Sequence, residues 1–268
     1  MEGLRSLQQH FLDSDLKGIR LLEENAGDSA SRKVADWTYR DGDIHMVGIR
    51  RNENEVFDTD SGTRRRRNDD VIVLLIHGTR WVFRGSTNPS PNIARRPDQP
   101  FLIRGQHEYR FGWHKIAGTE QRPGRSKVYR AYKPRNWKGP LIVRAVGDLL
   151  TDESFTAATP NPAINVHWSG SGTANWSAGC QVVAGAKYLN FKGDLVDASH
   201  RAAAGYGQLS GSKTRGAYNV FVDLTTIFAD DPRPAGDTIL YTLLYERDVR
   251  QTEAGSLIDF DQVVAQLS

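Results

Sequence analysis

Short runs of β-branched and aromatic residues, separated by Gly, Pro and Asn, recur along the chain from Asp43 onward. Such residues favour pleated, half-buried strands, and the turn residues between them mark where strands end. The runs are Val71–Ile76, Trp81–Phe83, Lys127–Tyr132, Leu141–Val146, Val220–Leu224 and Ile239–Leu244. Val71–Ile76 is apolar throughout, which predicts a strand buried on both faces, and Ile76-His77-Gly78-Thr79 predicts a turn after it. The sequence therefore predicts a mostly β domain, with Thr238–Tyr245 as a late strand that closes the sheet.

A helical pattern precedes this domain. Its apolar positions are Leu4, Leu7, Phe11, Leu12, Leu16, Ile19, Leu21 and Leu22. Their spacing predicts one N-terminal helix, or two short helices broken near Asp13-Ser14-Asp15, and packing on the β domain is favoured over docking of a partner. With Gly27–Lys33 as a linker, residues 1–33 form a helical segment and linker, and residues 251–268 form a C-terminal tail. Ala184–Ala204 is compatible with a short helix, although Gly193 interrupts it.

Composition narrows the class of protein. The chain has 268 residues, 38% of them hydrophobic, which is enough to bury a full core as one large or two small domains. Its net charge of +3 is too small to indicate nucleic-acid binding, although a pI near 9.0 favours an anionic surface such as a cell wall. One cysteine and seven scattered histidines form no compact ligand set, and no phosphate-binding glycine loop occurs. We therefore expect no metal and no cofactor.

The segment best suited to chemistry surrounds the single cysteine, Cys180. Ile164–Val166 predicts a short strand that delivers His167 to a cleft, and the apolar run after Cys180 predicts a second strand. An imidazole that takes the proton of a neighbouring thiol makes the sulfur a strong nucleophile. The small residues Ser177-Ala178-Gly179 would let backbone N–H groups approach a substrate carbonyl as an oxyanion hole. A lone cysteine is more often a small buried apolar residue, but this local combination favours a nucleophile.

The same residues resemble the signature of the L,D-transpeptidase catalytic domain, a family of cysteine enzymes that act on peptidoglycan stem peptides. The family pattern is a histidine, a variable loop, then Ser or Thr, His, Gly, Cys, a hydrophobic residue and Arg. His167, Ser177, Gly179 and Cys180 match it, and the variant around Cys180 is similar to a divergent branch in phage and bacterial proteins. The resemblance implies a β-sandwich-like catalytic domain over residues 43–250, with a short helix after the cysteine. It also implies that Cys180, His167, Ser177 and Gly179 are catalytic.

Two positions depart from that pattern. Ala178 stands where the family has its second histidine, and Val182 stands where it has arginine. His114, on a strand that would line the substrate groove, is a candidate replacement for the histidine. Arg110 or Arg104 could replace the arginine as a carboxylate clamp, because the planar guanidinium suits a peptide carboxylate. Trp176 and Gln181, which lie close to Cys180 in the chain, are expected to contact substrate.

The resemblance implies acyl transfer through a Cys180 thioester on stem tetrapeptides, followed by hydrolysis or by transfer to an amine. Two alternatives stay open: a cysteine peptidase or amidase of another substrate, and a noncatalytic cell-wall-binding or virion-structural module. The first twelve residues lack the apolar core of a secretory signal, and no later stretch predicts a membrane span. A cell-wall substrate would then require release or export by a route other than general secretion, from a protein that is cytoplasmic until that point.

Overall fold

The computed structural model describes residues 2–51, 57–58, 65–90, 98–115, 128–146, 150, 154–202, 214–233, 236–250 and 260–267. Nine of its strands form one sheet, in the order β11-β8-β7-β14-β1-β4-β5-β12-β13. Strand β11 (Val166–Trp168) also pairs with β12 (Gln181–Leu189), so the first eight strands close into a barrel and β13 (Leu195–Asp197) extends from its edge. The prediction of a mostly β fold is confirmed, whereas a sandwich of the kind the resemblance implies is not what these strands form.

The other barrel strands are β1 (His45–Arg50), β4 (Asp70–Ile76), β5 (Thr79–Ser86), β7 (Gly105–Lys115), β8 (Val128–Pro134) and β14 (Thr238–Tyr245). Strand β14 pairs in parallel with β1 and antiparallel with β7, so it lies inside the sheet order and does not close it. The closing contact is made by β11 and β12. Strand β4 is buried on both faces apart from the half-buried Leu75, as its apolar run predicts.

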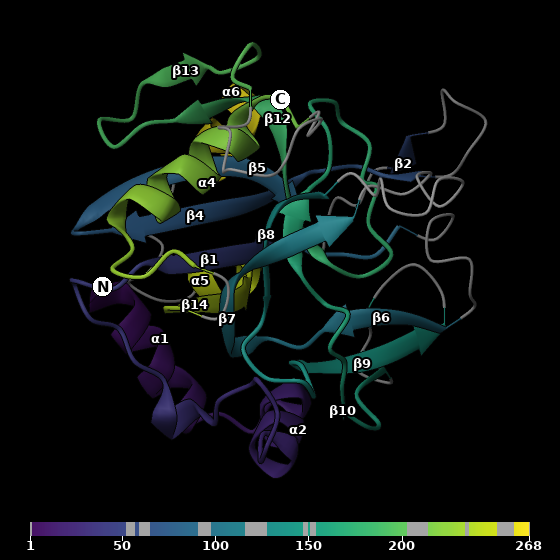
Figure 1. Ribbon diagram of the computed structural model, residues 1–268. Coiled ribbons are helices and arrows are strands. Elements are labelled where there is room, and N and C mark those ends of the chain that lie inside the picture. Colours follow the sequence, from purple (N-terminus) through teal and green to yellow (C-terminus); the bar gives the residue numbers. More distant parts are fainter. Residues whose placement is uncertain are drawn as a thin grey trace.

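Alternate side chains of these strands point into and out of the barrel, since successive residues of a strand face opposite sides. The inward set forms one apolar cluster that includes Met46, Ile72, Phe83, Phe111, Tyr132, Val166, Val183 and Tyr241. Helix α4 (Ala217–Phe228) covers this cluster, and the ring of its Phe221 lies 5.2 Å from Phe83 and 5.7 Å from Tyr132 between centroids. Figure 1 shows α4 lying across the barrel near β12 and β4.

Helices from both ends of the chain cover part of the outer face. The N-terminal pattern forms two helices, α1 (Glu2–Leu12) and α2 (Lys17–Asn25), broken where Asp13-Ser14-Asp15 predicts a break. The C-terminal residues, expected as a tail, form α6 (Phe260–Leu267) after α5 (Glu246–Arg250). One cluster joins Leu4, Leu7 and Phe11 of α1, Phe260, Val263 and Leu267 of α6, and Val47, Ile49, Val71 and Val73 of the barrel. Both ends of the chain therefore belong to the core.

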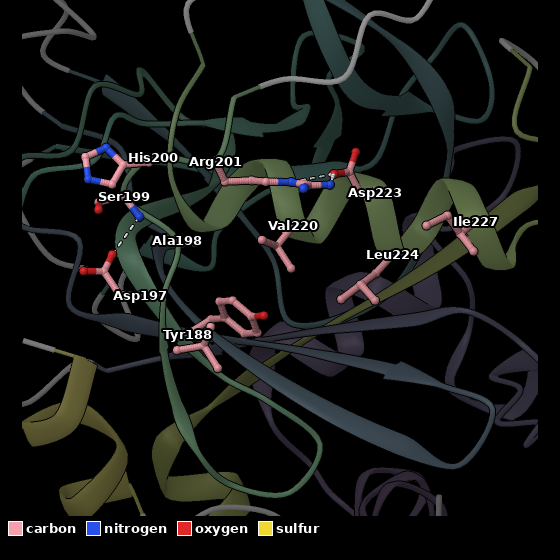
Figure 2. A pocket seen from close by; sticks show the side chains of 11 residues that line it. Tyr188, Asp197, Ala198, Ser199, His200, Arg201, Val220, Asp223, Leu224 and Ile227 are labelled. Carbon is pink, nitrogen blue, oxygen red and sulfur yellow. Dashed lines mark hydrogen bonds and ion pairs between the residues drawn. The ribbon is translucent and has the colours of Figure 1, made fainter.

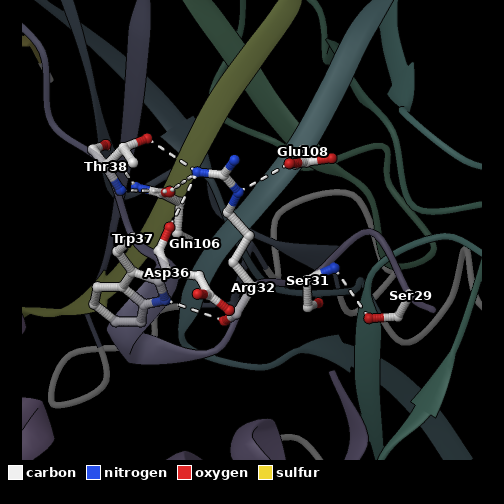
Figure 3. Close-up of polar contacts among 8 residues, drawn as sticks. All are labelled: Ser29, Ser31, Arg32, Asp36, Trp37, Thr38, Gln106 and Glu108. Atoms are coloured by element: carbon white, nitrogen blue, oxygen red, sulfur yellow. Dashed lines mark hydrogen bonds and ion pairs between the residues drawn. The ribbon is translucent and has the colours of Figure 1, made fainter. Parts of the chain in front are cut away.

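The segment after α2 is fastened to β7. Arg32 forms an ion pair of 2.8 Å with Glu108 and donates a hydrogen bond to Gln106, as Figure 3 shows. The Ser31 hydroxyl lies 2.8 Å from Nδ1 of the buried His107. A short 3₁₀ helix, η1 (Val34–Asp36), follows. Gly27–Lys33, expected as a linker, is instead partly held against the barrel by these contacts.

Two predicted elements are of the wrong type. The helix expected within Ala184–Ala204 is absent from the described residues 184–202, because that stretch contains β12, which pairs with β5 and β11, and then β13. The strand expected at Val220–Leu224 lies inside α4. Its β-branched and aromatic residues favour strands locally, but a helix buries Tyr218, Phe221, Val222 and Thr225 on one face, and tertiary burial overrides the local preference.

A small second sheet lies beside the cysteine segment. It consists of β6 (Asp98–Leu102), β9 (Leu141–Val146) and β10 (Thr159–Pro160), and a separate two-stranded ribbon joins β2 (Phe57–Asp58) to β3 (Arg65–Arg66). Pro100 of β6 packs directly against Gly179. No helix in the described part of the chain is long and apolar enough to cross a bilayer.

Candidate functional site around Cys180

Cys180 and His167 lie on the same face of two adjacent strands. Strands β11 and β12 are parallel, with Val166 opposite Gln181 and His167 opposite Val182. Val166 belongs to the inward cluster, so the alternating His167 points outward. Cys180 directly precedes Gln181, whose side chain points into the barrel, so by the same alternation the Cys180 side chain points outward. The two side chains predicted to form the catalytic pair therefore project from one surface, two residues apart along the strands.

The thiol of Cys180 is half-buried and held by backbone groups. The N–H of Asn165 donates to Sγ at 3.3 Å, and the thiol donates to the carbonyl of Ala163 at 3.2 Å. Burial raises the pKa of the Cys180 thiol above its ordinary value, while the Asn165 N–H and the Lys133 ammonium oppose that rise. The resting group is therefore a neutral thiol that needs a base.

The imidazole of His167 is the candidate base, and no hydrogen bond among the described residues joins it to Sγ of Cys180. Its Nδ1 lies 2.8 Å from the carbonyl of Trp168, and a carbonyl only accepts, so the proton of the neutral ring sits on Nδ1. The hydroxyl of Tyr129 lies 3.2 Å from the same Nδ1. Burial, the His114 imidazole and the Lys133 ammonium lower the pKa of His167 to about 3. At neutral pH, Nε2 therefore carries a free lone pair.

His114, the candidate second histidine, belongs to this group. Its ring stacks on His167 with 4.2 Å between centroids and 14° between planes. The side-chain amide of Asn165 lies 3.4 Å from Nδ1 of His114. Burial and the Lys133 ammonium lower the pKa of His114 to about 4, so both stacked rings are neutral at pH 7. The structure thus brings His114 into contact with His167, and its stacked ring contact is with this imidazole and not with the thiol of Cys180.

Ser177 and Gly179 shape the loop before the cysteine. The buried Ser177 hydroxyl donates to the carbonyl of Cys180 at 2.9 Å and accepts the N–H of Gly179 at 3.1 Å. Ser177 therefore stabilises the loop, and neither of these hydrogen bonds reaches the imidazole of His167. Because the Gly179 N–H is engaged, the N–H of Cys180 is the better candidate oxyanion donor. Gly179 has φ +155°, and a Cβ there would lie 2.7 Å from Cγ of Pro100.

The predicted substrate contacts separate into two kinds. Trp176 is 52% exposed near the cysteine loop, where a substrate can reach it. Gln181 is fully buried and points into the barrel, where its amide oxygen accepts the hydroxyl of Tyr241 at 3.0 Å. Arg104 is also buried, in an ion pair of 2.7 Å with Asp248. Both side chains are therefore buried away from the surface: Gln181 points into the barrel, and Arg104 lies beside Phe11 of α1 and Asp248 of α5.

Arg110 and a residue that the sequence did not single out, Lys133, lie level with the cysteine. Lys133 of β8 stands directly opposite Arg110 of β7. The β8–β11 register pairs Tyr132 with Val166, and continuing it by one residue places Lys133 beside Asn165, which is level with Cys180. Tyr129 and Lys133 were missed because only the pairing of distant strands brings β8 to the cysteine, whereas Asn165 lies within the predicted cysteine segment and was not singled out.

We compared the chain with protein-family models, with curated proteins and with solved structures. None matched. The interpretation of the site therefore depends on its geometry and on the residues themselves.

A separate pocket of about 780 Å³ lies between β12, β13 and α4 (Figure 2). Its lining includes Tyr188, Val196 and Leu224, and an ion pair between Arg201 and Asp223 spans one side. None of its lining residues belongs to the cysteine site. Among the described residues, no group of three or more His, Cys, Asp or Glu side chains is arranged to hold a metal ion.

Proposed function

We propose that the protein is a cysteine-dependent acyltransferase or hydrolase that acts on peptidoglycan stem peptides through a Cys180 thioester. One observation carries the proposal: Cys180 and His167 project from the same outer face of adjacent strands, and His167 keeps an unprotonated Nε2. The stacked His114 supports it by holding the base in place. The peptidoglycan substrate follows from the resemblance of the cysteine segment to L,D-transpeptidases.

In the proposed reaction, His167 takes the thiol proton and Sγ attacks the carbonyl of the donor peptide bond. The Cys180 N–H stabilises the oxyanion of the tetrahedral intermediate. The intermediate expels the amine of the terminal D-alanine, which takes a proton from His167, and leaves a thioester on Cys180. Water then releases the shortened peptide as an acid, or an amine of a second peptide forms a new amide.

Mass spectrometry of defined disaccharide tetrapeptides incubated with the protein tests this function. We expect wild-type protein to release one D-alanine or to form a cross-linked dimer, and Cys180→Ala protein to do neither. We expect His167→Gln to lower the rate about 100-fold or more, because general-base catalysis supplies at least that factor. An acylated Cys180 trapped by acid quench would identify the thioester. Turnover that persists in Cys180→Ala would overturn the proposal.

A noncatalytic cell-wall-binding module is the second candidate. The observation that favours it is the neutral thiol, whose Sγ is engaged with Ala163 and Asn165 and whose pKa is raised by burial. Sedimentation with insoluble peptidoglycan separates the two functions. Equal binding by wild-type and Cys180→Ala protein, with no change in any fragment, would support the binding module in place of the enzyme.

A further inference from the structure

A row of polar side chains crosses four strands at the level of the nucleophile. The strand registers place four residues side by side: Arg110 on β7, Lys133 on β8, Asn165 just before β11 and Cys180 just before β12. All four point to the outer face, because each alternates with an inward residue. Adjacent strands are about 4.8 Å apart, so the stems of both cations begin within about 15 Å of Cys180. Their flexible side chains can cover much of that distance.

The two cations stand directly opposite each other without a protein carboxylate between them. Like charges at opposite cross-strand positions destabilise a sheet unless a counter-charge joins them. Within the described chain, the Lys133 side chain has no hydrogen bond or ion pair, and the Arg110 side chain donates only to the carbonyl of Pro134, at 3.4 Å. This contrasts with Arg32 and Arg104, which both pair with carboxylates. The counter-charge for the pair is therefore absent from the described protein.

The stem of Lys133 packs on a glycine of the neighbouring strand. The neighbouring cross-strand pair is Gly112 and Ala131, and a Cβ on Gly112 would lie 2.6 Å from Cγ of Lys133. The lysine stem thus lies on the bare backbone of Gly112, on the same face as His114. The Lys133 ammonium lowers the pKa of both His114 and His167 and opposes the rise in the pKa of Cys180. Its field therefore extends over the reacting groups.

We infer that Lys133 and Arg110 form a carboxylate-binding subsite beside Cys180, with Lys133 as its inner cation. This inference rests on the proposed function and makes it more specific, because it names Lys133 and Arg110 as the residues that hold a free carboxylate of the acyl donor. The carboxylate is either the C-terminus of the leaving residue or a side-chain carboxylate of the donor residue.

Alkylation of Cys180 tests the subsite without any peptide. Iodoacetate is anionic and iodoacetamide is neutral, so the ratio of their rate constants reports positive charge at Sγ. We expect Lys133→Met to lower this ratio about tenfold, because a hydrogen-bonded charge contributes about that factor. We expect Lys133→Arg to retain the ratio. Lys192→Met removes one positive charge beyond the far end of β12 and should leave the ratio unchanged. A ratio that is equal in wild type and Lys133→Met would overturn the inference.

Turnover of matched donor peptides then identifies the carboxylate. Amidation of the C-terminus in one donor, and of the side-chain carboxylate in another, should lower kcat/KM about tenfold for only one of them, and Lys133→Met should abolish that difference. If wild-type protein turns over neither donor, while Lys133→Met still lowers the alkylation ratio, the proposed reaction is rejected and the anion subsite is kept. If Lys133→Met shows the same difference in kcat/KM between free-acid and amidated donors as wild-type protein, the subsite is rejected and the reaction is kept.

Discussion

The imidazole of His114 stacks on the imidazole of His167 at 4.2 Å, although the two residues come from strands β7 and β11, which do not pair with each other. Strand β8 lies between them. Its Tyr129 stands opposite His114, and continuing the β8–β11 register places the small Ala131 opposite His167, so the two rings meet diagonally across β8. The stack keeps water from one face of His167 and adds a second neutral ring to a buried site.

Replacing His114 should change the proton affinity of His167. Burial is the leading cause of the low pKa of His167, and His114 adds to it. We expect His114→Ala to expose the ring and raise the pKa of His167, with an activity about tenfold lower because the base is less well placed. His114→Phe keeps a flat ring and should raise the pKa less. An NMR titration of His167 checks this, and equal pKa values in both variants would contradict the role of stacking.

Gly179→Ala should destabilise the loop that carries Cys180. The φ of +155° is strained for a residue with a Cβ, and that Cβ would meet both Cγ of Pro100 at 2.7 Å and its carbonyl at 3.0 Å. We expect the free energy of unfolding to fall by about 2 kcal/mol. Gly172→Ala is the control, since a Cβ there meets nothing within 4 Å. Urea denaturation measures both variants, and similar losses for the two would argue against close packing at Gly179.

Acid should destabilise the protein well above the pH at which carboxylates titrate. Burial lowers the pKa of His45, His107 and His167 to about 3, and that of His114 to about 4. Between the unfolded value near 6.5 and these folded values, only the unfolded chain binds the protons. Stability is therefore complete above about pH 7 and falls as the pH drops, by at most about 1.4 kcal/mol per pH unit for each histidine.

Urea unfolding at pH 7.5 and at pH 5 measures this slope. His107→Gln should reduce the number of protons taken up on unfolding, which this slope reports, by about one. Replacement of the exposed His10 by Gln should not change the slope. A stability that is constant from pH 7.5 to 5 would show that the buried histidines are already protonated in the folded state.

Arg104→Met should unfold the protein more readily without acting at the cysteine site. Arg104 and Asp248 form a buried ion pair, with side chains 2% and 4% exposed, so removing one partner leaves an uncompensated buried charge. We expect a loss of about 4 kcal/mol, of which Arg104→Met combined with Asp248→Leu recovers most. Arg144→Met, which breaks a pair with Asp98 that is about one-third exposed, should cost less than about 1 kcal/mol. Thermal unfolding of the three variants tests the difference.

Local patterns were sufficient for much of the fold. The apolar runs at Val71–Ile76 and Thr238–Tyr245 predicted strands that the structure contains, because β-branched residues and turn residues act over a few positions. The turn at His77-Gly78 was predicted in the same way, and both residues have positive φ, 46° and 74°, as a two-residue hairpin requires. The cysteine segment was also identified locally, since a strand, a glycine-rich turn and a second strand place His167 near Cys180.

Strand pairing decided the rest, because it joins residues that are far apart in the sequence. It closes a barrel through β11 and β12, and burial against that barrel makes a helix of Ala217–Phe228, although Val220–Leu224 within it locally favours a strand. Pairing also determines which candidates reach the surface: Gln181 points into the barrel, while Arg110 comes level with Cys180. Lys133 carries no motif of its own, and only the register of β7, β8 and β11 brings its charge to the thiol. The sequence by itself determined the strands and the reactive segment, and the tertiary structure decided which side chains surround it.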